Sequence, residues 1–129
     1  FNQGASKKIP IFIFLGYSVE EKIENNSEEN MRNLEEFIAH IAKQDEPSSE
    51  WKPLIKALWW VRKGDWDKAH DLAQEVDCPD GSWVHAYLHR EEGDIGNAGY
   101  WYRRAGRPVK TTDSLEYEWI EISRELLNN

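Results

Sequence analysis

The sequence has little of what defines several classes of protein. Its 129 residues include one cysteine, Cys78, and one methionine, Met31. A single cysteine excludes an internal disulfide and is typical of a reducing compartment, so we expect a cytoplasmic protein. No apolar run approaches the ~20 residues that a membrane helix needs. The net charge of -8 argues against a general nucleic-acid binder, because such proteins present a basic surface.

Catalytic signatures are also missing. The chain has no glycine-rich phosphate loop, no nucleophile elbow and no Cys-x-x-Cys pair. Asp65 and Asp94 each follow a glycine that ends a predicted helix, so we interpret them as helix N-caps rather than as acids. The sequence therefore leans against an enzyme and implies no cofactor.

What is present is a set of helical patterns rich in large aromatic side chains. We predict an N-terminal extended segment over residues 1–26, with a strand-like stretch at 9–15, and a single α-helical domain over residues 27–129. Because the chain begins at Phe1, part of residues 1–30 could be added or upstream sequence. One apolar stripe predicts a helix within about 27–44, and a second apolar stripe predicts the last helix of the chain. Asp113 and Glu116 form a capping box at the start of this last helix, and the face opposite its apolar stripe is acidic. The two stripes comprise Leu34, Phe37, Ile38 and Ile41, and Leu115, Trp119, Ile122 and Leu126.

The middle of the chain contains an internal repeat at an offset of 29 residues. Small and turn-forming residues recur in register: Ala57, Gly64, Asp65 and Ala69 return as Ala86, Gly93, Asp94 and Ala98. A small residue in each helix allows two backbones to approach closely, and Gly-Asp ends one helix while capping the next. We predict two repeats at about 53–76 and 82–105, separated by a turn over residues 78–81, with Ser82 as the N-cap of the following helix.

This spacing resembles the tetratricopeptide repeat over about residues 51–108. The resemblance implies an all-α fold of antiparallel helical hairpins, flanked here by N- and C-terminal amphipathic helices, and a function in protein or peptide binding. The second unit departs from the pattern, because His89 replaces the expected aromatic residue and His85 replaces a leucine. The run WVHAYLHREEGD with NAGYWYRRAGR is also similar to a group of short bacterial proteins of unknown activity.

In such repeats the first helix of each hairpin lines a concave groove, which is the first candidate site. Tryptophan, tyrosine and arginine dominate binding hot spots, and two arginines beside aromatic residues would suit an acidic partner segment. The candidate groove residues are Trp51, Leu54, Leu58, Arg62, Trp83, Tyr87 and Arg90. The alternative is that this face is covered by the helix within 27–44 or by residues 9–15.

The histidines form a second candidate site. His85 and His89 lie one helical turn apart, a spacing that metal sites use, and His70 or Glu92 could add a third ligand. The alternative is a pair of semi-buried histidines that hydrogen-bond to their neighbours.

A third candidate is the basic cluster of Arg103, Arg104, Arg107 and Lys110, which could bind an anion. The alternative is that cations simply stabilise the end of the preceding helix. Taken together, these patterns favour a non-catalytic protein or peptide interaction module, or a self-associating one. The alternative is a small metal- or anion-binding protein or enzyme that uses the histidines and the arginine cluster.

Overall fold

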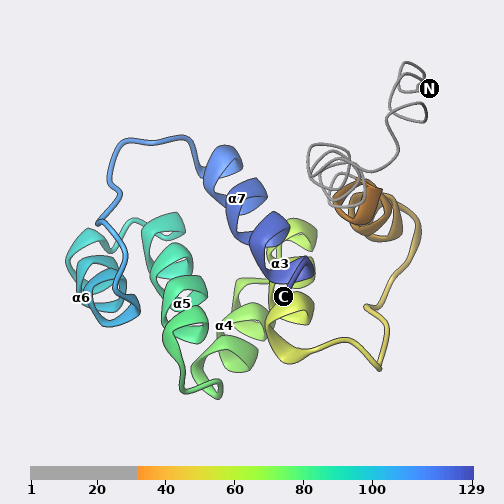
Figure 1. Cartoon of the computed structure of the whole chain (residues 1–129), viewed down its shortest axis with the longest axis horizontal. Coiled ribbons are helices and arrows are strands. Elements are labelled where there is room, and N and C mark those ends of the chain that lie inside the picture. Colours follow the sequence, from red (N-terminus) through yellow and green to blue (C-terminus); the bar gives the residue numbers. More distant parts are fainter. Residues whose placement is uncertain (1–31) are drawn as a thin grey trace, which may run out of the picture.

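The computed structural model describes residues 32–129, and all regular secondary structure in that range is helical (Figure 1). The predicted all-α class is therefore confirmed for these residues. The predicted extended segment over residues 1–26 lies outside the described residues. None of the helices described is long and apolar enough to cross a membrane. The elements are a helical segment over 32–43, α3 (Pro53–Lys63), α4 (Trp66–Gln74), α5 (Pro79–Glu91), α6 (Ile95–Ala105) and α7 (Leu115–Leu127).

Two turns of the same geometry join α3 to α4 and α5 to α6. Gly64 and Gly93 lie in the left-handed region, with φ of 85° and 92°, a conformation that glycine adopts without steric cost. Asp65 and Asp94 follow them, and each side chain accepts a hydrogen bond from the backbone N–H three residues on, at 3.1 Å and 3.2 Å. Both aspartates are N-caps, as the sequence predicts, so each turn ends one helix and begins the next.

The small residues of the repeat lie where helices meet. Ala57, Ala69, Ala86 and Ala98 are all fully buried, α3 packs on α4, and α5 packs on α6. The pairs are joined by contacts of α5 with α4 and with α3. Figure 1 shows α6 at one end of the molecule, followed by α5 and α4, with the helical segment 32–43 at the other end beside α3 and α7.

Helix α5 is the centre of the fold, because every residue from 81 to 90 is buried. It begins at Pro79, with Cys78 as its N-cap residue, so the predicted turn over 78–81 and the predicted cap Ser82 are wrong. Proline is well tolerated in the first helical turn, where its missing N–H has no partner. Gly81 is needed for close approach, since a Cβ atom there would lie 1.9 Å from the backbone oxygen of Val76.

Helix α7 crosses over α3 and α5 and completes the core. Its Trp119 ring stacks on Phe37 at 5.8 Å between centroids, and its indole N–H donates to the backbone oxygen of Leu58 at 3.0 Å. The N-cap is Ser114 rather than the predicted Asp113, and Leu115 is exposed. The buried stripe of α7 is therefore shorter at its start than predicted.

Candidate functional site

The predicted groove is closed by the chain's own α7. Leu58, Trp83, Tyr87 and Arg90 are all buried, with exposures between 0% and 7%. Trp51 and Leu54 are half-buried, and only Arg62 is exposed. The expectation of an open face is thus wrong for most of these residues. Leu58, Tyr87 and Arg90 each contact a residue of α7. Trp51 instead packs on Phe37 and His40 of the helical segment 32–43, which is the cover that the sequence offered as the alternative.

The buried arginine has an internal partner. Arg90 donates to Glu118 of α7 at 2.6 Å, and the hydroxyl of Tyr102 donates to the same carboxylate at 2.7 Å. Burial, followed by the hydrogen bond to Glu118, raises the pKa of Tyr102. The acidic segment that the arginines were expected to bind is therefore supplied by α7, since Arg62 also pairs with Glu116 at 2.8 Å.

The basic cluster is largely paired with carboxylates. Arg104 lies 3.6 Å from Asp77, and Lys110 lies 2.9 Å from Glu121. Arg107 pairs with Glu125, and its guanidinium also lies 3.4 Å from the centre of the Trp83 ring. Arg107 and Lys110 therefore tie the segment after α6 to α7, whereas the pair of Arg104 is exposed. Arg103 is exposed and has no carboxylate partner among the described residues, so the cluster leaves less positive charge for an external anion than its composition suggests.

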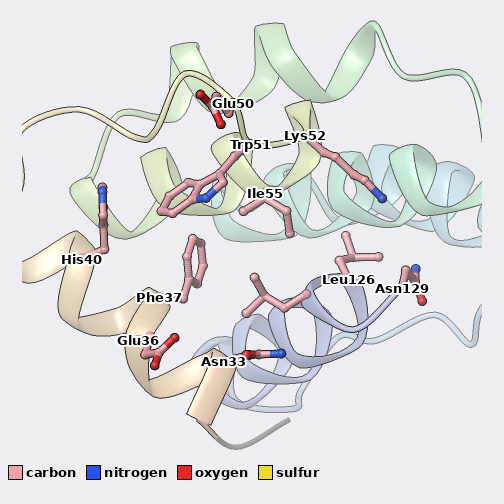
Figure 2. Close-up of a pocket in the computed structure, with 11 residues that line it drawn as sticks. Asn33, Glu36, Phe37, His40, Glu50, Trp51, Lys52, Ile55, Leu126 and Asn129 are labelled. Carbon is pink, nitrogen blue, oxygen red and sulfur yellow. The ribbon is translucent and has the colours of Figure 1, made fainter. Parts of the chain in front are cut away.

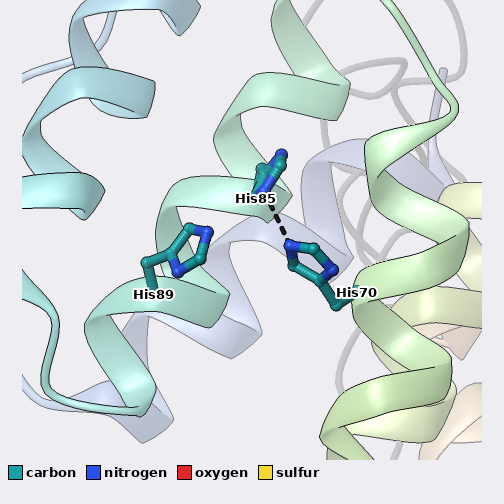
Figure 3. A group of neighbouring side chains, drawn as sticks. All are labelled: His70, His85 and His89. Atoms are coloured by element: carbon teal, nitrogen blue, oxygen red, sulfur yellow. Dashed lines mark hydrogen bonds between the residues drawn. The ribbon is translucent and has the colours of Figure 1, made fainter.

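The histidines, in contrast, come together in one cluster. His70 of α4 joins His85 and His89 of α5, and a nitrogen of each lies within 4.8 Å of the others. The Nε2 atoms of His70 and His85 are 2.9 Å apart. Figure 3 shows His70 reaching from its helix toward His85, with His89 one turn further along α5. We refer to these three residues as the histidine cluster.

Two tryptophans flank the histidine cluster. Trp66 stacks on His70 with ring centroids 4.7 Å apart, and Trp101 stacks on His85 at 3.9 Å. The indole N–H of Trp66 donates to the backbone oxygen of Leu88 at 2.8 Å, which fixes that ring against α5. The imidazole rings of His70 and His85 are thus each packed against an aromatic wall.

A carboxylate orients the third histidine. Nδ1 of His89 lies 2.8 Å from a carboxylate oxygen of Glu92, so this nitrogen carries the proton in the neutral ring. Nε2 of His89 is then free to bind another partner, and its one hydrogen-bonding contact among the described residues is the side-chain amide of Asn97 at 3.4 Å. A histidine whose other ring nitrogen donates to a carboxylate is the usual arrangement around protein-bound metal ions.

The cluster favours neutral imidazoles. Burial, together with the neighbouring His70 and His89, lowers the pKa of His85 from 6.5 to about 4. Burial and His89 also lower the pKa of His70. Neutral imidazole is the form that binds metal ions, so at neutral pH these two rings need no net loss of a proton. The ring that donates in the Nε2–Nε2 hydrogen bond must first move its proton from Nε2 to Nδ1.

The sequence named all three histidines but could not show that they converge. The signal was the departure of the second repeat from its own pattern at His85 and His89. The roles of Trp66 and Trp101 were missed, because tryptophans in a helical repeat are interpreted first as core residues. Trp101 is in fact half-buried, with its ring on the imidazole of His85.

A separate cavity of about 560 Å³ lies between the helical segment 32–43, the start of α3 and the end of α7. Figure 2 shows Phe37, Trp51, Ile55 and Leu126 around it, with polar side chains nearby. Trp51 is the one groove residue that lines this cavity. The imidazole of His40 is fixed here, because its Nδ1 accepts a hydrogen bond from Trp59 at 3.0 Å.

Comparison of the chain with protein-family models, with curated proteins and with solved structures found no match.

Proposed function

We propose that this chain binds a divalent first-row transition-metal ion, of which zinc is the representative, through His70, His85 and His89. The observation that carries the proposal is the convergence of three imidazole nitrogens within 4.8 Å of one another, from two different helices. Nitrogen donors of this kind suit zinc, copper, nickel and iron rather than magnesium or calcium.

The cluster needs only small adjustments to hold such an ion. Zinc–nitrogen bonds of 2.0–2.1 Å in a tetrahedron place the nitrogens roughly 3.3 Å apart. The Nε2 atoms of His70 and His85, 2.9 Å apart, would separate slightly, and His89 would turn toward them. The 3.4 Å contact from Asn97 to Nε2 of His89 would be released, which costs little because Asn97 is exposed.

The helical frame supplies the positioning. We infer a tetratricopeptide-like pair of hairpins, supported by the repeated Gly-Asp turns and the buried alanines at an offset of 29 residues. In that frame His85 and His89 occupy the buried central helix, where unpaired polar groups are costly. An ion would replace the contacts that their Nε2 atoms now make with His70 and Asn97, and would tie α4 to α5.

The test is calorimetric titration of the chelator-treated protein with Zn(II). We expect one ion per chain, at submicromolar Kd, and a loss of at least about 100-fold in affinity for His85→Gln. His40→Gln is the matched control, because His40 is the one histidine of the chain outside the histidine cluster and lies beside Trp51 and Trp59. Absence of binding, or equal affinity in His85→Gln, would contradict the proposal.

A second candidate, peptide binding, is supported by the cavity beside Trp51. Its lining combines apolar side chains with Glu36, Glu50 and Lys52, in a chain of net charge -8, which favours an apolar segment with basic residues. Fluorescence anisotropy with a panel of basic amphipathic peptides tests it. Binding that Leu127→Lys abolishes would support this function, since the added ammonium repels a basic peptide, and no binding across the panel would contradict it.

A further inference from the structure

We propose that the metal ion at the histidine cluster keeps one coordination position open, and that this position takes water, hydroxide or another small monovalent anion. The inference rests on the proposed function and adds to it the kind of site and the class of its exchangeable ligand. It follows from the number of donors, the nature of the surrounding walls and the place where the cluster reaches the surface.

The protein supplies three donors, not four. Among residues 32–129, the candidate metal group that contains His70 and His85 has one further member, His89. The ligand atoms of these three residues all lie within 4.8 Å of one another. Glu92 holds Nδ1 of His89, on the other side of the ring from Nε2, so it orients the ligand rather than binding the ion. Structural zinc sites have four protein ligands, whereas sites with three protein ligands hold water or a substrate in the fourth position.

The tryptophan walls of the cluster cannot provide the missing ligand, and the nearby amide of Asn97 is an exposed side chain that directs its nitrogen, not its oxygen, at His89. Indole offers only an N–H donor and no lone pair for a cation. Trp66 has already donated its N–H to the backbone of Leu88, and Trp101 lies flat on His85. The tryptophans therefore shield the faces of the imidazole rings without completing the coordination sphere, and they restrict the fourth ligand to a small molecule.

The open position faces the accessible side of the cluster. His85 and His89 are only 6% and 8% exposed, whereas His70 on α4 is half-buried. A ligand from solvent therefore reaches the ion beside His70. Three neutral imidazoles leave the full double charge on the ion, and this charge favours an anion over a neutral molecule.

Cobalt(II) substitution tests the inference, because bound Co(II) absorbs visible light in a way that depends on its ligands. The chelator-treated full chain is loaded with one equivalent of Co(II) in chloride-free buffer and titrated with sodium azide. We expect a visible Co(II) spectrum that azide changes saturably, with an apparent Kd in the millimolar range. The same response is expected from His40→Gln, which leaves the cluster intact.

The two proposals fail in different ways. If no visible spectrum of bound Co(II) develops, or His85→Gln gives the same spectrum as the unsubstituted chain, the metal site itself is refuted. If the spectrum develops and depends on His85 but does not change with azide up to about 0.5 M, the ion has no exchangeable position and only the further inference is overturned.

Discussion

The guanidinium of Arg90 lies 2.6 Å from the carboxylate of Glu118, and both side chains are withdrawn from solvent, at 5% and 0% exposure. This pair joins the central helix α5 to α7 and explains why the predicted groove is closed. The residues that make a good peptide-binding surface are present, and the chain's own C-terminal helix occupies them.

The first prediction concerns this pair. Glu118→Gln keeps the shape of the side chain but leaves the charge of Arg90 buried without a counter-ion, so we expect a loss of about 3–5 kcal/mol in the free energy of unfolding. Urea denaturation followed by tryptophan fluorescence measures it. Glu121→Gln, which breaks an exposed pair with Lys110, should cost less than about 1 kcal/mol. Equal costs would show that the buried pair does not hold α7.

The second prediction compares two glycines in first helical turns. Gly81→Ala places a Cβ atom 1.9 Å from the oxygen of Val76, so the link between α4 and α5 must shift. We expect a destabilisation of more than about 2 kcal/mol. Gly96→Ala in α6 meets nothing within 4 Å, and should stabilise the fold by up to about 1 kcal/mol. Thermal melts of the two variants check this, and a neutral Gly81→Ala would contradict the close contact.

The third prediction concerns the orientation of His89. Glu92→Gln retains a hydrogen-bonding side chain but removes the charge that orients the imidazole, so affinity for Zn(II) should fall about 10- to 100-fold. Calorimetric titration measures the change. Glu91→Gln is the neighbouring control, since it removes the same charge but Glu91 is not grouped with the histidine cluster, and the affinity of this variant should stay within about twofold. Similar losses in both variants would mean that net charge, rather than orientation, sets the affinity.

The fourth prediction is a pH dependence of the metal-free protein. The pKa of His85 is 6.5 when unfolded and about 4 when folded, so between these values the unfolded chain binds the extra proton. Stability should therefore be complete above about pH 6.5 and fall as the pH drops toward 4, by about 3 kcal/mol from this residue.

Urea midpoints at several pH values in EDTA measure that dependence. The wild type and His85→Gln should have different slopes between about pH 6.5 and pH 4, with the variant losing less stability over this range. Identical slopes would contradict the lowered pKa. Carboxylates that titrate in the same range contribute equally to both proteins, so they cancel in the comparison.

The parts of the fold that the sequence predicted are those fixed by local interactions. The Gly64-Asp65 and Gly93-Asp94 turns form from a positive φ and a cap three residues away, which a short pattern contains. The start of α5 was missed because Cys78-Pro79-Asp80-Gly81 has the composition of a turn. Only the packing against Val76 shows that its glycine is required inside a helix.

The arrangement of the candidate site could not be predicted, because it depends on contacts between residues that are far apart in the sequence. The amphipathic pattern of α7 predicts that one face is buried, but not that this face covers Leu58 and Arg90. His70 lies on α4, 15 residues before His85, and the approach of the two rings depends on how α4 packs on α5. Sequence spacing identified the pair on one helix and left the third ligand open between His70 and Glu92, and tertiary packing brings His70 to the pair.

The burial of residues 81–90 of α5 has a kinetic consequence. Its amide protons should exchange with solvent only when the whole domain opens, so His85 and His89 stand on the slowest-exchanging helix. His70 stands on α4, where only Ala69 and Ala73 are buried, and this helix can open locally at lower cost. A bound ion should therefore be lost at the rate at which α4 detaches, and its residence time would report the motion of that one helix.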